Sequence, residues 1–420
     1  MDINAGDTAW VLVSAGLVLF MTPGLAFFYG GMVRGKSVLA IMGQCFGVLA
    51  VVSVVWMLLG YTLAFGSGGG GFIGGLKFAG FANAQDPVPG YTLTIPPMAF
   101  AAFQMMFCVI TAALLAGTGA DRMKFGSFLT FTALWALVVY VPLAHWVFSP
   151  TGWLAQMGVL DFAGGSVVEM NSGASALALA IVLGRRRGWP GEAMPPHSLP
   201  LTLVGAGVLW FGWFGFNAGS ALSAGSVAAQ ALVSTQLAAC MGLLGWIAVE
   251  KFSTKHATTL GAASGAVAGL VAITPAAGFV NSVAALFIGL GGGVAAALAV
   301  RVKFRLGYDD SLDVVGVHGV AGVVGTLAVG LFATRTVNSA VSHEGLFSGG
   351  GWHLLGVQAL TVVVTLAFAF TLTWLVAQVV RRTMGLRVPP QEEIDGLDTH
   401  THLEAAYDFG AVRAGARIPL

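Results

Sequence analysis

The chain has 420 residues, of which 57% are hydrophobic and 9% are charged, and its formal net charge is +1. Ordinary soluble domains carry about 25% charged residues, so this composition excludes a soluble globular protein, and the near-zero net charge gives no footprint for nucleic acid. Apolar runs of the length that crosses a bilayer, about 20 residues, recur along the sequence. We therefore expect an integral membrane protein in contact with the lipid bilayer. The three cysteines show no metal or disulfide spacing and are interpreted as core thiols, and no cofactor is predicted.

Eleven apolar segments are predicted to be transmembrane helices. In chain order they lie near residues 8–33, 38–65, 97–118, 126–148, 163–184, 199–219, 227–250, 259–275, 279–302, 314–333 and 353–380. The predicted fold class is therefore an all-α integral membrane protein with a transmembrane domain over 1–383. The polar remainder, 384–420, is predicted to be a tail that is either a docking surface or a solvated extension, and composition leaves both open.

The basic residues between these segments predict the sidedness of the protein. Of the 19 lysines and arginines, all but Lys77 and Arg335 lie in alternate connections and in the tail. Basic connections stay in the cytoplasm, so the amino terminus is predicted outside and the carboxyl terminus inside. This arrangement needs an odd number of spans, which agrees with eleven. The longest outside connection, near 66–96, is rich in glycine and is predicted to be irregular.

A pattern of three residues occurs twice, once at the fifth span and once at the tenth. The matched pairs are Asp161 and Asp310, Glu169 and His318, and Gly173 and Gly322. Five spans separate the two copies, so the helices run in opposite directions, as in an inverted repeat. We expect five-helix halves near 1–190 and 199–345, plus one extra helix near 353–380. The repeat axis brings Glu169 and His318 together near the midplane, where such folds bind their substrates.

Few ionisable side chains lie inside the predicted spans, and Glu169 and His318 are the most deeply placed. Such groups usually face a cavity and have a partner, which makes this pair the candidate for chemistry. Asp161 begins the fifth span, where it either caps backbone N–H groups or orders backbone carbonyls toward a cation. An intramembrane enzyme with Glu169 and His318 as acid and base is disfavoured, because no nucleophile or metal ligands accompany them.

Several aromatic residues fall near the outer ends of spans. They include Phe107, Phe148, Trp213 and Phe216, with Ser220 one turn beyond the last of these. Such rings are often interfacial anchors. They also hold small cations through cation–π contact, which a hydroxyl acceptor would complement. The spacing alone leaves both interpretations open.

Five runs together resemble the ammonium transporter family (Amt/Mep/Rh), and its bacterial Amt branch more than its Rh branch. They are TPGLAFFYGG (22–31), AFQMMF (102–107), DFAGG (161–165), GWFGFNAGSA (212–221) and DVVGVHGVAG (313–322). They occur in the order of the family, and the resemblance covers nearly the whole chain. It implies an eleven-helix homotrimer in the bacterial inner membrane, with one pore in each subunit for ammonium, ammonia and methylammonium.

The resemblance also implies roles for single residues. Phe107, Phe148 and Ser220 would form the outer ammonium site, with Asp161 in support. Phe107 and Phe216 would be the stacked rings that close the pore mouth. Trp213 would line the path, and Glu169 with His318 would form a proton relay. The tail run GLRVPPQEEIDGLD (385–398) and HLEAAY (402–407) resembles the regulatory carboxyl terminus to which a PII signalling protein docks.

Three positions depart from the family pattern. Glu169 replaces the first of two pore histidines, as it does in some fungal relatives. Phe148 stands where bacterial relatives more often carry Trp, the best cation–π ring. Leu403 stands where relatives usually have Gly. The implied function is ammonium transport, in which ammonium is recruited at the outer site and deprotonated, and ammonia is conducted through an apolar pore. Two alternatives stay open: an ammonium sensor that signals through the tail, and a neutral ammonia gas channel.

Overall fold

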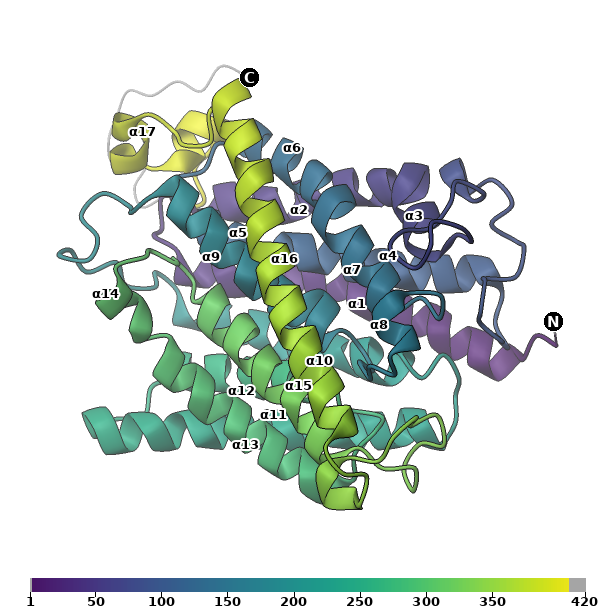
Figure 1. Ribbon diagram of the computed structural model, residues 1–420. Coiled ribbons are helices and arrows are strands. Elements are labelled where there is room, and N and C mark those ends of the chain that lie inside the picture. The colour runs from purple at the N-terminus through teal and green to yellow at the C-terminus, as the bar shows by residue number, and fades with distance from the viewer. Residues whose placement is uncertain (1, 408–420) are drawn as a thin grey trace.

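The computed structural model describes residues 2–407, which form a helical bundle (Figure 1). Its α-helices are α1 (Ala5–Met32), α2 (Val38–Val55), α3 (Tyr61–Phe65), α4 (Pro97–Leu114), α5 (Ala116–Gly119), α6 (Phe125–Trp135), α7 (Val141–Val147), α8 (Trp153–Gln156), α9 (Asn171–Leu183), α10 (Leu199–Gly219), α11 (Ser226–Thr254), α12 (Thr259–Ile273), α13 (Ser282–Ala299), α14 (Val302–Leu306), α15 (Ala321–Phe332), α16 (His353–Thr383) and α17 (Pro390–Asp395). Wider π-helical turns are η1 (Trp56–Gly60), η3 (Ala136–Tyr140), η4 (Gly165–Met170), η5 (Val315–Val320) and η7 (Asp398–His402).

Within the described part of the chain, 10 helical segments are long and apolar enough to cross a bilayer. The eleventh predicted span is α12, an apolar helix of 15 residues. At about 1.5 Å per residue it is shorter than the roughly 30 Å hydrocarbon core. Pro275 follows its end, and a proline disfavours continuation of a helix because it lacks the N–H donor and its ring crowds the preceding turn. Most of α12 is buried among other helices, so the protein itself surrounds it.

The two halves of the bundle meet through equivalent helices. The first helix of each half, α1 and α10, packs against the other, and η4 and α9 pack against η5 and α15. At the centre the contacts are reciprocal. A Cβ at Gly173 would collide with the backbone of Gly319, and a Cβ at Gly322 would come within 3.0 Å of Glu169 Cβ. The helices approach too closely for a side chain at Gly173 and leave little room for one at Gly322.

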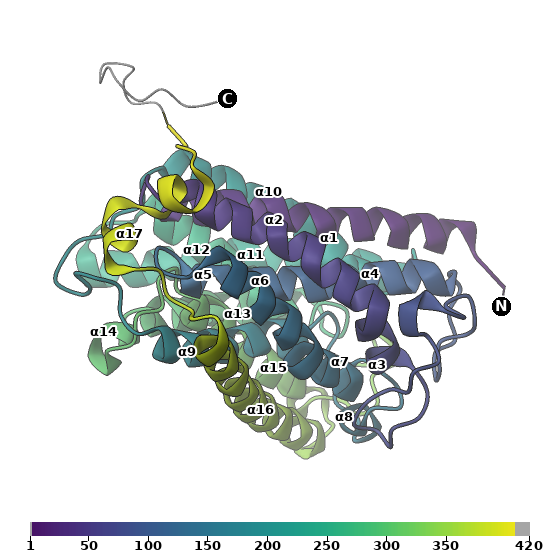
Figure 2. The ribbon, with the colours of Figure 1, turned by 90° about the horizontal axis from the view of Figure 1, so that it is seen from above.

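The extra helix α16 lies obliquely across the outside of the bundle, as Figures 1 and 2 show. It packs against α9, α15 and α6. Thr373 of α16 takes part in a buried hydrogen-bonded cluster. In it the indole N–H of Trp135 is shared between the hydroxyls of Ser175 and Thr373, each at 3.0 Å. The helix therefore buttresses both halves of the repeat while belonging to neither.

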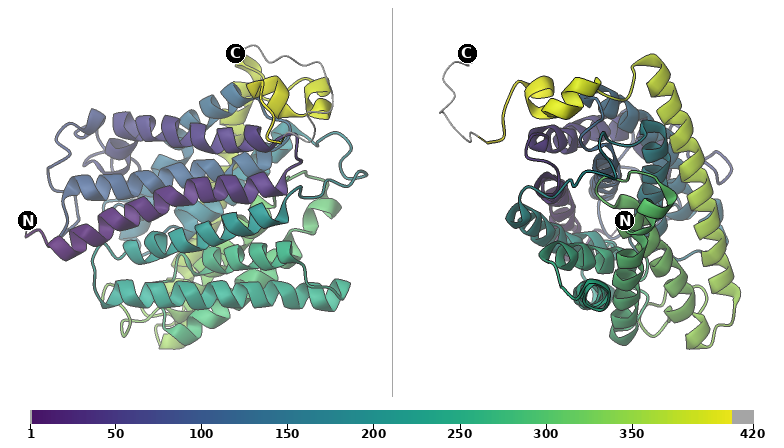
Figure 3. Two further views of the ribbon diagram at one scale, coloured as in Figure 1. Left: turned by 180° about the vertical axis from the view of Figure 1, so that it is seen from behind. Right: turned by 90° about the vertical axis from the view of Figure 1, so that its left-hand side faces the viewer.

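The long connection 66–96 is irregular, as predicted, with one short 3₁₀ turn, η2 (Ala79–Phe81). It lies at the same end of the bundle as the start of α1, since the N–H of Asn4 donates to the carbonyl of Thr94 at 2.8 Å. The described tail lies at the opposite end (Figure 3). The basic connections gather there, which agrees with the alternation of charge in the sequence.

The described part of the tail is packed against the bundle. The N–H of Ala40 donates to Asp398 at 2.8 Å, and the N–H of Val388 donates to the carbonyl of Arg122 at 3.0 Å. The carboxylate of Glu393 accepts from Arg387 at 2.7 Å and from the N–H of Arg187, also at 2.7 Å. Residues 384–407 thus form a docked segment, and residues 408–420 of the predicted tail lie outside the described part.

Candidate functional site

Asp161 caps the turn that carries Glu169. Its carboxylate accepts from the N–H groups of Gly164, Gly165 and Ser166 at 2.8, 2.7 and 2.8 Å, and from the hydroxyl of Ser166. Gly164 has a φ of +118°, a region that favours glycine. The first turn is wound as the π-helical η4, and its orphan donors all point at one anion. The capping interpretation of Asp161 is therefore confirmed.

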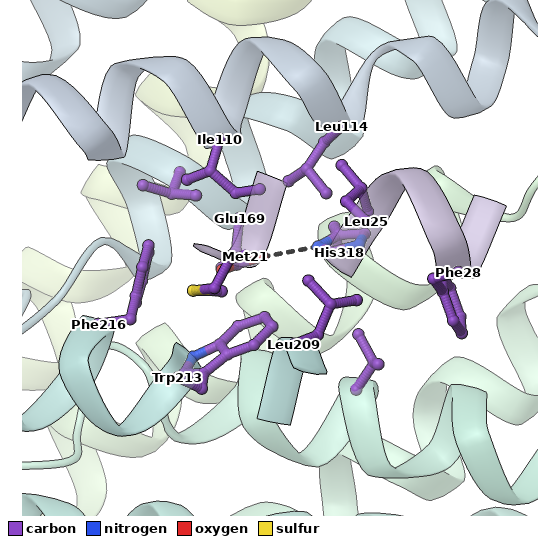
Figure 4. A pocket seen from close by; sticks show the side chains of 12 residues that line it. Met21, Leu25, Phe28, Ile110, Leu114, Glu169, Leu209, Trp213, Phe216 and His318 are labelled. Atoms are coloured by element: carbon purple, nitrogen blue, oxygen red, sulfur yellow. Dashed lines mark hydrogen bonds and ion pairs between the residues drawn. The ribbon is translucent and has the colours of Figure 1, made fainter. Parts of the chain in front are cut away.

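Glu169 and His318 meet at the centre of the bundle. Their side chains come from η4 and η5, and Glu169 Oε2 lies 2.8 Å from His318 Nδ1 (Figure 4). Both residues are buried, at 1% and 4% exposure. Either the imidazole N–H donates to the carboxylate or the carboxylic acid donates to the imidazole. The repeat predicted this contact from spacing alone, and the structure confirms it.

The pair opens onto a narrow, largely apolar cavity, drawn in Figure 4. Its walls include Leu25, Ile110, Leu114, Leu209 and Val267. The cavity volume is about 10 Å³, which is about the room that one water-sized molecule needs. Such a space suits a small neutral molecule better than an ion with its hydration shell.

Stacked rings lie beside this cavity. The rings of Phe107 and Phe216 are parallel to within 19°, with centroids 4.2 Å apart, and both residues are 1% exposed. Phe216 also contacts Trp213, which lines the cavity, at 5.5 Å between centroids. The indole N–H of Trp213 donates to Thr274 Oγ1 at 2.9 Å, so the ring is held by a partner outside the cavity.

Phe148, Ser220 and Asp161 are not among the residues that line this cavity. Phe148 is half-buried and its ring faces Gly164, next to the turn that Asp161 caps. Ser220 is half-buried, and its hydroxyl donates to the carbonyl of Phe216 at 2.8 Å. The structure therefore brings Trp213, Phe216, Glu169 and His318 together around the cavity, with Phe107 stacked on Phe216. Phe148, Ser220 and Asp161 lie outside this set.

The second copy of the pattern has its own capped turn at the tail end of the bundle, which we call the inner corner (Asp309, Asp310 and η5). Asp310 accepts from the N–H of Val315 at 2.7 Å and from the hydroxyl of Thr118 at 3.2 Å. Burial raises the pKa of Asp310. The outer corner is correspondingly Leu160, Asp161 and η4, in which Ser166 N–H occupies the place of Val315 N–H.

A buried ionic network surrounds the inner corner. Arg186 makes a two-pronged contact with Asp309, at 2.9 Å for each oxygen, and Arg122 donates to the carbonyl of Asp309 at 2.7 Å. Arg186 also lies 3.4 Å from Asp121, which pairs with Arg34 at 3.1 Å. Burial lowers the pKa of Arg122 to about 10, although the Asp309 charge opposes this shift.

Sequence reasoning treated the arginines of this network only as markers of sidedness, and it did not predict the role of Thr274. A Thr-Pro pair at 274–275 after an apolar run marks the end of a helix. This pair of residues does not indicate that the Thr274 hydroxyl accepts a hydrogen bond from the indole of Trp213, 61 residues earlier in the chain.

Comparisons with known proteins agree with this geometry. A family model described as the Ammonium Transporter Family matches residues 9–407. An ammonium transporter of Bacillus subtilis is 49% identical over 406 residues, covering 96% of this chain and 99% of its own length. The crystal structure of Saccharomyces cerevisiae Mep2 is similar at a TM-score of 0.87 with 35% identity, covering 93% of this chain and 88% of that one.

A second solved structure, described as a sensor Amt protein, is similar at a TM-score of 0.86 with 32% identity. The match covers 94% of this chain and 98% of that one. Both the sequence relative and the structures extend over nearly the full described chain. This protein belongs to the ammonium transporter family.

Proposed function

We propose that the chain takes up ammonium at the outer aromatic mouth, removes a proton there, and conducts neutral ammonia through the cavity. Glu169 and His318 carry the proton separately. The observation that supports this most directly is the 2.8 Å contact between these two side chains in an otherwise apolar cavity beside stacked rings.

The cavity favours a neutral passenger for an energetic reason. An ion that leaves water for apolar surroundings loses its hydration, and a transfer without compensating partners costs several kcal/mol or more. The cavity walls supply few such partners beyond the central pair. Ammonia has the size of water and no charge, so deprotonation at the mouth avoids this cost. We propose Phe107, Phe148 and Ser220 as the mouth, Asp161 as its support, Phe107 with Phe216 as the gate, and Trp213 as lining.

The two members of the pair titrate together. A neutral acid beside a neutral imidazole and a carboxylate beside an imidazolium both have a net charge of zero, and the protonation steps belong to the pair. Loss of one more proton gives a net charge of −1, which two imidazoles reach with much greater difficulty. The Glu169–His318 pair therefore attracts a proton or a cation more readily than two histidines would. We expect a changed pH dependence and weaker selectivity against potassium.

The test is ammonium-evoked current in proteoliposomes for Glu169→Gln, which cannot release a proton, and for Glu169→His. We expect Glu169→Gln to lower the current at least tenfold, and Glu169→His to conduct with a shifted pH profile. Glu344→Gln is the matched control, because Glu344 lies in the connection between α15 and α16, away from the cavity. A Glu169→Gln protein that conducts like the native one would show that Glu169 relays no proton.

The same recordings address a neutral gas channel, which would pass ammonia without current. A sensor remains the second candidate, favoured by the docked tail and by the similarity to a sensor Amt protein. Uptake of methylammonium by cells that lack other ammonium transporters separates the two. A sensor alone would leave such cells without uptake.

We further propose a homotrimer whose subunits each hold a pore, and a PII signalling protein as the partner of the tail. Large apolar side chains on α1, α10 and α11 remain exposed in the single chain, including Phe20, Phe211 and Leu244, and would be covered by subunits or lipid. The protein is proposed to lie in the bacterial inner membrane, with 1–383 as the transporter domain, halves near 1–190 and 199–345, and 384–420 in the cytoplasm. Mass measurement in native detergent micelles tests the trimer, and co-purification with PII tests the partner.

A further inference from the structure

A buried amide on the extra helix contacts the outer corner. Gln358 of α16 is fully buried. Its Oε1 accepts from the N–H of Leu160 at 3.1 Å, and its Nε2 donates to the carbonyl of Leu160 at 2.8 Å and to that of Thr326 at 3.1 Å. One side chain thus pairs both backbone groups of a residue 198 positions away.

Leu160 needs such a partner. It lies in the connection between α8 and η4, where no helix supplies hydrogen bonds, and it is only 8% exposed. Among residues 2–407, Gln358 is the partner recorded for its N–H and for its carbonyl. A buried backbone group left unpaired is strongly destabilising. The position of this connection therefore depends on α16.

The next residue along the chain is Asp161. Its carboxylate gathers the N–H groups of Gly164, Gly165 and Ser166 and so sets the winding of η4. Glu169 projects from this same turn toward His318. A displacement of Leu160 would be passed directly to Asp161 and, through the capped turn, to Glu169.

The contact between Gln358 and Leu160 at the outer corner has an equivalent at the inner corner, made by a different kind of side chain. Glu169 and His318 are 149 residues apart, and the same offset carries Leu160 onto Asp309. The carbonyl of Asp309 accepts from Arg122 at 2.7 Å, in the place where the carbonyl of Leu160 accepts from Gln358. The outer corner therefore has a neutral clamp where the inner corner has a charged one.

The residue type suits the task. An amide presents a donor and an acceptor side by side, which matches the N–H and C=O of one backbone residue. It carries no charge, so it is less costly inside the membrane than an arginine would be. A helix that only filled space here would use leucine or methionine.

We propose that Gln358 is a positioning residue for ammonium transport: it holds Leu160 so that Asp161 keeps η4, and hence Glu169, in register with His318. This inference rests on the proposed function for its effect on transport. Its effect on the outer corner is independent of what the protein carries.

Hydrogen exchange of the amides in 160–168 tests the positioning directly. In Gln358→Met, which keeps the volume and removes the hydrogen bonds, we expect these amides to exchange about tenfold faster than in the native protein. Gln358→Asn is too short to reach both Leu160 atoms and gives a second variant with the same direction. Gln358→Glu, protonated in this buried place, has one donor and one acceptor, and is expected to restore slow exchange.

Gln378→Met is the matched control. Gln378 lies on the same helix and is 9% exposed, but its Oε1 has no hydrogen-bond partner. Its substitution is expected to leave 160–168 unchanged. Unchanged exchange of 160–168 in Gln358→Met and Gln358→Asn would overturn the proposal. Equal acceleration throughout α15 and α16 would also overturn it, because that pattern indicates general loosening.

Transport supplies the second readout. In Gln358→Met we expect the ammonium concentration for half-maximal current to rise at least threefold, with a smaller fall in maximal current. In the Asp161→Glu background, the added effect of Gln358→Met should shrink, since the two act through one path. Fully additive effects would count against that path. A native protein without ammonium-evoked current would refute the proposed function and leave the exchange result standing.

Discussion

The outer and inner corners share a backbone arrangement and differ in what holds them. Ser166 N–H lies 2.8 Å from Asp161, and Val315 N–H lies 2.7 Å from Asp310, each five residues along the chain. Around this common geometry, the outer corner uses the neutral amide of Gln358 and the inner corner uses Arg122 and Arg186. The repeat preserves the capped turn, because the turn positions the central pair, while the surroundings are free to differ.

The difference has a physical reason. The inner corner lies at the end of the bundle where basic connections gather, so arginines are at hand to pair with its buried carboxylates. Glu393 of the tail contacts both Arg387 and the backbone of Arg187, which directly follows Arg186. A change in the tail can therefore reach the inner corner through charged contacts. The outer corner is tied to α16 through a buried neutral side chain, and nothing comparable connects it to the tail among the described residues.

The largest expected effect comes from breaking the charged clamp. Arg186→Met leaves Asp309 and Asp121 buried without this cation, and breaking a buried pair in this way costs about 3–5 kcal/mol. We expect a clear fall in melting temperature in detergent, larger than for Gln358→Met. Arg187→Met is the control, because Arg187 is exposed. If Gln358→Met lowers the melting temperature more than Arg186→Met does, then the charged contacts of the inner corner do not contribute more to stability than the amide contact of the outer corner.

A smaller effect is expected from pH. Burial raises the pKa of Asp309, but hydrogen bonds from Arg186 and the charge of Arg122 lower it more, so the net pKa lies below the ordinary value of 3.8. A carboxylate with a lowered folded pKa stabilises the folded state above its unfolded pKa, and this contribution disappears as pH falls through the folded value. The difference in melting temperature between native protein and Asp309→Asn should stay level from about pH 7 to 5 and shrink below about pH 4. A difference that grows on acidification would contradict this assignment.

The smallest effect concerns the tail that reaches the inner corner. Leu403 has a φ of +56° and is 83% exposed. This left-handed conformation is unfavourable for a side chain by about 1–2 kcal/mol and costs glycine little. A glycine at this position would therefore relieve the backbone strain. Leu403→Gly should slow proteolysis of the tail by a few fold, whereas Leu403→Ala should not. Equal protection by both variants would point to loss of the exposed apolar side chain instead.

Much of the architecture follows from local pattern. Apolar runs of bilayer length predicted the spans, and the long helices confirm them, with α12 shorter than expected. Its end at Thr-Pro was visible in the sequence, but its shortness becomes tolerable only because neighbouring helices bury it. The Glu169–His318 contact was predictable as well, because an inverted repeat carries one position onto the other.

What the sequence by itself determined is therefore the membrane class, the repeat and the central pair, all of which are encoded in periodicity and spacing. The tertiary structure decided the partners that periodicity does not encode. Gln358 meets Leu160 across 198 residues, Trp213 meets Thr274, and Arg186 meets Asp309. Each of these contacts is made by a single polar side chain with a residue far away in the sequence. Only the packing of whole helices decides which backbone or side-chain atom it reaches.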